Sequence, residues 1–222
     1  MPVVGLLAEG PTDAMVIEAV VANIRPDVRI IPLLPEMDAS GIMAATPNSH
    51  GYGWTGVRSY CASIRDDLEE FLRSITSEPL DGLLVHVDCS MAHNVGLQHP
   101  CPQAMTTATA LSSLVQTTWL QLPGPMSNFI VVTPSMEIEA WVVAALGLQR
   151  RSPAPLECDP DITMELVHAK ILKMKRDRHG VQAPKKAQRT YVDMKARIAA
   201  GTPAIVSQCT TAAAFATALA RL

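Results

Sequence analysis

The sequence predicts an α/β protein in which a mostly parallel sheet is flanked by helices. Short apolar runs alternate with longer segments whose apolar residues recur at helical spacing. The 222 residues are 48% hydrophobic, enough to bury a core without help from disulfides or metals. Charge divides the chain: residues 1–149 hold fifteen acidic and five basic side chains, and residues 150–222 hold six and thirteen. We therefore expect an α/β domain over residues 1–149 and a helical, basic C-terminal extension over residues 150–222.

The first strand is expected over residues 2–7 (PVVGLL), which stop at an acidic turn. A helix then opens at Pro11 and Thr12, because proline is tolerated at the first helical position and threonine can cap. Residues 28–34 (VRIIPLL) predict a second strand, and Pro32 places it at the edge of the sheet because proline cannot donate to a ladder.

The middle of the chain predicts a long loop, a helix and a central strand. Residues 35–56 are rich in glycine, alanine, proline and small polar residues, which is typical of a functional loop. Residues 58–75 have apolar side chains at helical spacing. Residues 82–87 (GLLVHV) predict a buried strand that ends at Asp88.

The remaining elements continue the alternation. A polar loop precedes a helix expected over residues 103–120, and a short strand is expected over residues 129–132. Another helix is expected to begin near Ser135. Residues 150–155 (RRSPAP) resemble a linker, and beyond them we expect two basic helical segments and a C-terminal helix over residues 210–222.

Several classes of protein are disfavoured. The chain has no internal repeat, no GxGxxG motif and no Walker lysine loop, so the common nucleotide-binding interpretations of this fold class fail. No basic segment precedes an apolar run at the start, and no charge-free apolar stretch approaches about 20 residues, so we expect neither a signal peptide nor a membrane partner. Five cysteines without a CxxC pair favour free thiols in a reducing compartment. These observations predict a cytoplasmic protein.

Acidic residues follow three of the expected strands. Glu9 follows the first strand, Asp88 the central one, and Glu137 and Glu139 the last one. Ligands of open α/β sheets bind outside the carboxyl ends of the strands, so these four carboxylates are expected to converge on one rim. Carboxylate oxygens are the ligands that Mg²⁺ and Mn²⁺ prefer. Of the two last glutamates we favour Glu137 for the site, because residues two apart do not share a helix face.

Three short motifs then resemble those of the Toprim superfamily. LLAEGPTD (residues 6–13) is similar to its first motif, a strand followed by Glu-Gly and a helix. VHVDCS (residues 85–90) stands where the superfamily has Asp-x-Asp, and PSMEIEAW (residues 134–141) resembles the glutamate-rich segment of small Toprim-like bacterial proteins. Their relatives include the OLD (overcoming lysogenisation defect) nucleases and other phage-defence effectors.

The resemblance implies a parallel Toprim sheet and phosphodiester chemistry. Glu9 would be the general acid or base, Asp88 a metal ligand, and Mg²⁺ or Mn²⁺ the cofactor. Ser90 stands in place of the second aspartate, so either Glu137 or Glu139 supplies the missing charge or the protein binds without cutting. The resemblance also implies an ATPase as a partner protein.

A second group of residues could bind zinc. Four soft ligands lie within thirteen residues, although their spacing matches no common zinc finger and both cysteines can instead be free thiols. The group consists of Cys89, His93, His99 and Cys101. His86 lies inside a strand and is expected to be a core histidine and not a ligand. Trp141 is expected to pack in the core.

Ten of the eighteen basic residues lie between Lys170 and Arg197. With only Tyr191 nearby, this segment lacks the interleaved aromatic side chains that stack on bases, so it would contact phosphates of DNA or RNA. The alternative is a solvated surface. The expected nucleic-acid contacts are Lys170, Lys173, Lys175, Arg176, Lys185, Lys186 and Arg189.

The sequence thus predicts a metal-dependent phosphoryl-transfer protein, most simply a nuclease. The alternative is a non-catalytic, Toprim-derived subunit that binds nucleic acid or regulates a multi-protein complex. A small-molecule phosphohydrolase would leave the basic segment unexplained.

Overall fold

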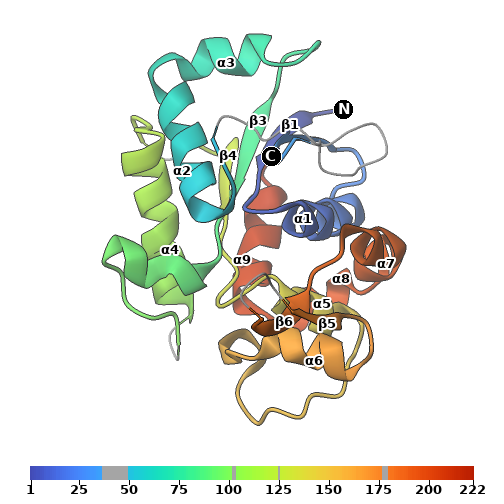
Figure 1. The fold of residues 1–222 in the computed structure, drawn as a ribbon. Helices are drawn as coiled ribbons and strands as arrows, with labels where there is room; N and C mark the ends of the chain where they lie inside the picture. Colours follow the sequence, from blue (N-terminus) through green and yellow to red (C-terminus); the bar gives the residue numbers. More distant parts are fainter. Residues whose placement is uncertain (37–49, 102–103, 125, 177–179) are drawn as a thin grey trace.

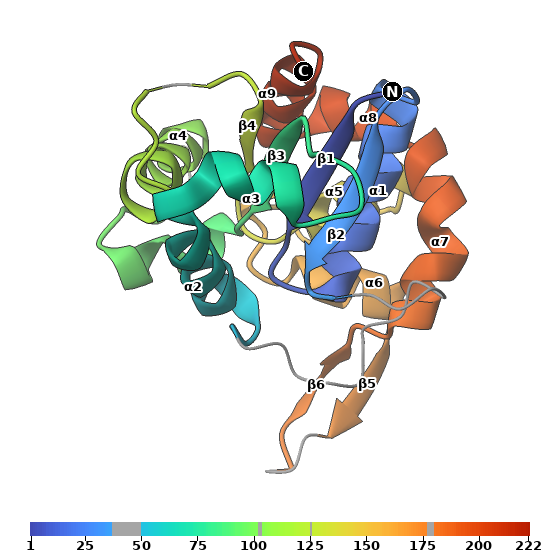
Figure 2. The ribbon, with the colours of Figure 1, turned by 90° about the horizontal axis from the view of Figure 1, so that it is seen from above.

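The centre of the fold is a four-stranded parallel sheet with the strand order β2-β1-β3-β4 (Figure 1, and Figure 2 for all four strand labels). The computed structural model describes residues 1–36, 50–101, 104–124, 126–176 and 180–222. The strands are β1 (Val3–Leu7), β2 (Arg29–Leu34), β3 (Gly82–His86) and β4 (Phe129–Val132). All four were predicted within one or two residues at each end, and the proline-containing β2 lies at an edge as expected.

Helices cover both faces of the sheet, as predicted for an α/β protein. Successive side chains of a strand point to opposite faces, so Leu6 and Leu84 enter one core while Leu7 and Leu83 enter the other. The first core is completed by α1 (Pro11–Ile24), α5 (Glu139–Ala145), α6 (Ile162–His168), α7 (Gln188–Ala200), α8 (Thr202–Gln208) and α9 (Thr210–Leu219). The second is completed by α2 (Gly53–Ile64), α3 (Leu68–Ser74) and α4 (Ala104–Leu114).

Several helix boundaries differ from the prediction. The helix expected over residues 58–75 is divided by a 3₁₀ turn at Arg65–Asp67, and its first part begins at Gly53, inside the expected loop. Most of that loop, residues 37–49, lies outside the described residues. The helix expected over residues 103–120 ends as a π turn at Val115–Trp119. The helix expected from Ser135 begins four residues later, at Glu139.

The basic segment is only partly helical. A two-stranded antiparallel hairpin, β5 (Lys173–Arg176) and β6 (Gln182–Lys185), stands where the first basic helix was expected. Figure 2 shows this hairpin projecting from the body of the protein. The prediction failed because the spacing of charged side chains along an exposed segment carries no hydrophobic periodicity.

Residues 150–222 share a core with residues 1–149. Helix α7 lies against α1 and helix α9 against β4 (Figure 1). Trp141 of α5 is fully buried, as expected, and stacks on Phe215 of α9 with ring centroids 5.9 Å apart. The boundary at residue 149 stays a prediction, and the C-terminal part contributes helices to the first core of the sheet.

The cysteines differ from the prediction. Cys101 and Cys158 form a disulfide, whereas Cys61, Cys89 and Cys209 are free and buried. Disulfides persist mainly in oxidising compartments, so this pair weighs against the reducing compartment inferred from cysteine spacing, and the cytoplasmic location stays a prediction. Within the described ranges, no helix is both long and apolar enough to cross a membrane.

Candidate functional site

Five carboxyl groups lie together at the carboxyl ends of the strands. We call this group the carboxylate cluster. Its members come from the turn after β1, the first turn of α1, the turn after β3 and the segment that enters α5. They are Glu9, Asp13, Asp88, Glu137 and Glu139. The charges of Asp88, Glu137 and Glu139 raise the pKa of at least one other member. The four residues predicted from the sequence are thus in one region, as expected from their positions after parallel strands.

Glu9 joins three segments of the chain. Its side-chain Oε1 accepts a hydrogen bond from the backbone N–H of Asp88 at 2.9 Å. Its carbonyl oxygen accepts one from the N–H of Gly53 at 2.9 Å. Gly53 has φ +68°, in the left-handed region where glycine carries no steric penalty. The turn before α2 therefore fixes the backbone of Glu9, and the turn after β3 fixes its side chain.

The environment of Glu9 favours its protonated form. Burial is the largest cause, and the neighbouring Asp88 carboxylate adds repulsion, so the pKa of Glu9 rises from 4.5 to about 7. His86 and the backbone N–H groups of Asp88 and Trp54 oppose the rise. A carboxyl group with this pKa can give or take a proton near neutral pH.

Asp88 is held by the strand that it terminates. Its Oδ1 lies 3.2 Å from Nε2 of His86, a buried histidine as expected. Burial and the charge of Glu139 raise the pKa of Asp88 well above its ordinary value. Nδ1 of His86 is buried without a hydrogen-bond partner in the part of the chain that the structure describes. His86 thus uses one nitrogen to orient Asp88.

Asp13 belongs to the cluster although the sequence reasoning gave it no role. It lies four residues after Glu9, inside the first turn of α1, and only 7% of it is exposed. Burial raises its pKa from 3.8 to about 7, with Asp88 and Glu139 adding to the rise and His86 opposing it. Its place in the LLAEGPTD motif, one helical turn beyond Glu9, was the signal that could have identified it.

A lysine neutralises the other side of the cluster. Nζ of Lys186 lies 2.8 Å from Oε2 of Glu139 and 3.4 Å from Oε2 of Glu137. Burial opposes the charged form of Lys186, yet Glu139 and Glu137 together raise its pKa above the usual range. The hydroxyl of Tyr191 donates to Oε1 of Glu139 at 2.8 Å. Lys186 was expected to contact nucleic acid, and the structure instead places its ammonium among the cluster's own carboxylates.

The preference for Glu137 over Glu139 stays a prediction, because the structure places both glutamates in the cluster. The Glu139 side chain is fully buried, whereas that of Glu137 is 35% exposed and accepts a hydrogen bond from the hydroxyl of Thr163 at 2.5 Å. Because α5 begins at Glu139, Glu137 lies in the turn before the helix, so the helix-face argument that separated the two did not apply. Both glutamates reach Lys186.

The cluster only partly fits a divalent metal. Within the described ranges, no three aspartate, glutamate, histidine or cysteine side chains are grouped as a metal site. Within the described ranges, neither Glu9 nor Asp88 forms an ion pair with a lysine or arginine, although the charge of Lys186 acts on Asp88. Glu137 and Glu139 are paired with Lys186. Ser90, in place of the second aspartate, lies in the turn after β3 with its N–H 3.3 Å from the carbonyl of Met136. The residues present suit one cation at Glu9 and Asp88 better than two metals.

The four residues that could have formed a zinc group have other partners, and one of them is no longer a free ligand. Cys101 is in the disulfide with Cys158, and the buried thiol of Cys89 donates to the carbonyl of Thr133 at 3.8 Å. Nδ1 of His93 donates to the carbonyl of Ser90 at 3.1 Å, and Nδ1 of His99 accepts from the N–H of Cys101 at 3.2 Å. Each of the four side chains therefore has a local partner. Their closeness in sequence reflected one irregular loop.

The other basic residues remain available to a polyanion. Four lie on the exposed hairpin, one precedes it and one begins α7. They are Lys173, Lys175, Arg176, Lys185, Lys170 and Arg189. The hairpin adjoins the cluster because Lys186 directly follows β6. Comparisons with known proteins give no further guidance, since no family model, curated protein or solved structure matches the chain.

The raised pKa of Glu9 predicts how stability depends on pH. The folded protein keeps a proton on Glu9 up to about pH 7, whereas the unfolded chain loses it near 4.5. The free energy of unfolding should therefore fall as the pH rises through this window. The raised pKa of Asp13 lowers the free energy of unfolding in the same way as the pH rises from 3.8 to about 7. Urea unfolding at pH 5 and pH 8 should show the fall, and Glu9→Gln should reduce it.

Glu69→Gln is the matched control for this measurement, because the Glu69 side chain on α3 is 96% exposed. The control should reproduce the wild-type profile. A wild-type protein that gains stability between pH 5 and pH 7 would contradict the burial of Glu9 in a charged cluster.

Proposed function

We propose that the protein is a phosphoryl-transfer enzyme that hydrolyses phosphodiester bonds in nucleic acid with the help of Mg²⁺ or Mn²⁺. The observation that carries the proposal is the carboxylate cluster at the carboxyl edge of the sheet, with Glu9 near a pKa of 7 beside Asp88. Open α/β sheets bind their ligands at this edge. The resemblance to Toprim proteins supports the same assignment, on the motifs that contain Glu9, Asp88 and Glu139.

Each residue of the site has a role in this proposal. Glu9 holds or releases a proton at the reacting oxygen, since general acids and bases work best with a pKa near the operating pH. Asp88 and Glu9 would hold the metal, which supplies positive charge to the phosphate oxygens when bound. His86 orients Asp88 through the 3.2 Å contact. Lys186 provides a fixed positive charge next to Glu137 and Glu139, where a second metal would otherwise be needed.

The substrate class follows from the hairpin. Lys173, Lys175, Arg176 and Lys185 lie on the exposed β5–β6 hairpin, which leads directly into Lys186 at the cluster. A chain of phosphates bound along the hairpin would reach the carboxylate cluster. Contacts of this kind bind backbone phosphates without reading the bases. A role in phage defence and an ATPase partner are implied by the Toprim resemblance alone and stay predictions. The cytoplasmic location, which was inferred from the cysteine pattern and the apolar runs, also stays a prediction.

The test compares metal binding and cleavage in matched variants. Mn²⁺ titrated by calorimetry should bind wild-type protein and Glu69→Gln equally, and Asp88→Asn much more weakly. Fluorescein-labelled duplex DNA and single-stranded RNA should be cut by wild type in Mn²⁺. Glu9→Gln should cut about 10²–10⁴ times more slowly, the range for a lost general acid or base. Equal cleavage by wild type and Glu9→Gln would contradict the proposal.

A second candidate function is binding without cleavage. It is favoured by Lys186, whose ammonium already neutralises two carboxylates, and by the missing second aspartate at Ser90. Under this alternative the labelled nucleic acids are bound and stay intact in Mn²⁺. Binding should weaken with salt, with a slope of log K against log salt of about −0.9 per phosphate contact on duplex DNA. The double variant Lys173→Glu with Lys175→Glu should flatten this slope.

A further inference from the structure

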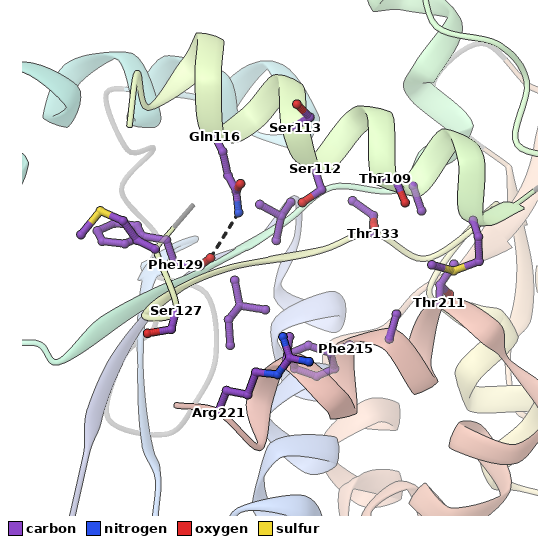
Figure 3. A pocket seen from close by; sticks show the side chains of 17 residues that line it. Thr109, Ser112, Ser113, Gln116, Ser127, Phe129, Thr133, Thr211, Phe215 and Arg221 are labelled. Carbon is purple, nitrogen blue, oxygen red and sulfur yellow. Dashed lines mark hydrogen bonds between the residues drawn. The ribbon is translucent and has the colours of Figure 1, made fainter. Parts of the chain in front are cut away.

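The free edge of the sheet opens into a groove. A cavity of about 590 Å³ lies between α4, β4 and α9 (Figure 3). We call it the β4 groove. It is distinct from the carboxylate cluster, none of whose residues line it. The lining residues that matter here are Ser112 and Gln116 of the α4 segment, Phe129 and Val131 of β4, and Ala214 and Arg221 of the C-terminal segment.

The backbone of β4 presents unpaired groups to this groove. The carbonyls of Asn128 and Val132 accept the N–H groups of Leu83 and Val87, so these residues face β3. Because successive residues of a strand alternate in direction, the peptide groups of Phe129 and Val131 face away from β3. Within the described ranges, the N–H and C=O of Val131 have no hydrogen-bond partner in the sheet or beyond it.

A hydrogen bond at Phe129 confirms that the peptide groups of Phe129 and Val131 face the groove. Nε2 of Gln116 donates to the carbonyl of Phe129 at 3.3 Å, from the groove side (Figure 3). At Phe129 a side chain thus completes the edge, whereas at Val131 nothing in the described part does so. A donor and an acceptor on one residue are what an added strand pairs with.

The groove is bounded by one helix on each side of β4. Figure 3 shows α4 and α9 on opposite sides of β4. Small residues from both helices line part of the groove, among them Ala108 and Ser112 on α4 and Ala214 and Ala218 on α9, while Met105 and Phe215 are the large ones. The edge of a second copy carries the same helices and would collide with these walls. A single extended peptide carries no flanking helices and avoids this collision.

Charge defines which end of the peptide is recognised. Arg221 is the one charged residue among those that line the groove, and none of them is acidic. No ion pair of its guanidinium occurs within the described ranges. Figure 3 shows Arg221 with Gln116, Ser127 and Phe129 at the end where β4 begins, opposite Thr133 and Thr211. A peptide that runs antiparallel to β4 ends beside Arg221.

We propose that the β4 groove binds the C-terminal segment of a partner polypeptide as a fifth, antiparallel strand. The segment pairs with the N–H and C=O of Val131, and its α-carboxylate binds the guanidinium of Arg221. Antiparallel edge strands are common on otherwise parallel sheets. The four residues of β4 span about 13 Å, so the groove accepts about four residues of the peptide.

The test uses a pool of pentapeptides randomised at every position. One pool carries the free α-carboxylate and the other the C-terminal amide, and each is passed over the immobilised full chain. The acid pool should be retained about tenfold more than the amide pool, because the amide loses the charged partner of Arg221. Arg221→Gln should remove this difference, and the control Arg73→Gln on α3 should keep it.

Two further measurements bear on the strand itself. Saturation with the retained acid pool should slow hydrogen exchange at the Val131 amide and leave its rate unchanged in Ala214→Trp, where the indole fills the groove. Equal retention of the two pools by wild type would overturn the carboxylate assignment. No retention of either pool, or exchange at Val131 that stays as fast with peptide, would overturn the groove as a peptide site.

Discussion

Replacing Lys186 by methionine should lower the free energy of unfolding by about 3 kcal/mol at pH 8. The substitution keeps the length of the side chain and leaves the fully buried Glu139 without its cation. Breaking a buried ion pair from one side typically costs 3–5 kcal/mol, and the low end applies because the Lys186 side chain is 34% exposed. Urea unfolding measures the effect.

The control variants separate charge from packing. Lys185→Met, at an exposed position on β6, should change stability little. The double variant Lys186→Met with Glu139→Gln should recover most of the loss, since a neutral amide can still accept the hydrogen bond from Tyr191. If the double variant is as unstable as the single one, Lys186 contributes through its aliphatic stem and the electrostatic account is wrong.

Removing the disulfide should lower the free energy of unfolding by a similar amount. Cys101 and Cys158 are 57 residues apart, and closing a loop of this length restricts the unfolded chain by about 4 kcal/mol at 25 °C. The double variant Cys101→Ser with Cys158→Ser should therefore unfold at much lower urea than the oxidised wild type. Reductant should lower the stability of wild type and leave the double variant unchanged. A wild type that responds to urea identically with and without reductant would show that the two cysteines do not pair.

The disulfide also lies next to a buried carboxylate that is not part of the carboxylate cluster. Glu157, the neighbour of Cys158, accepts hydrogen bonds from the N–H groups of Thr210 and Thr211 at 2.7 and 3.1 Å. These are the first residues of α9, whose N–H groups have no partner inside the helix. The disulfide thus anchors the segment that caps α9, so its loss should loosen one wall of the β4 groove.

The central strands β1 and β3 were predictable from the sequence because they are buried on both faces. Residues 82–86 are a continuous run of buried residues, and such runs are the typical pattern of a central parallel strand. The edge position of β2 followed from Pro32, because proline cannot donate a hydrogen bond to a ladder. The π turn at Val115–Trp119 and the break at Arg65–Asp67 were not predictable, since their side chains keep the spacing of a helix.

The carboxylate cluster was predictable only where strand ends determine position. Glu9 and Asp88 terminate parallel neighbours, so their closeness follows from the topology. Lys186 and Tyr191 reach Glu139 from positions 47 and 52 residues away in the chain, and no local pattern encodes such a contact. Lys186, the cation of the cluster, was therefore predicted to be a nucleic-acid contact instead.

The contact between α1 and α7 has a consequence for biosynthesis. A ribosome releases the chain from its amino end, so Val16 and Val20 of α1 are made long before Tyr191 and Ile198 of α7, which lie in the same core. Until α7 has emerged, one face of the nascent sheet and the helix α1 lack the helices that cover them. Folding of this face must wait until α7 has been synthesised, and the exposed apolar surface is the kind that chaperones bind in the meantime.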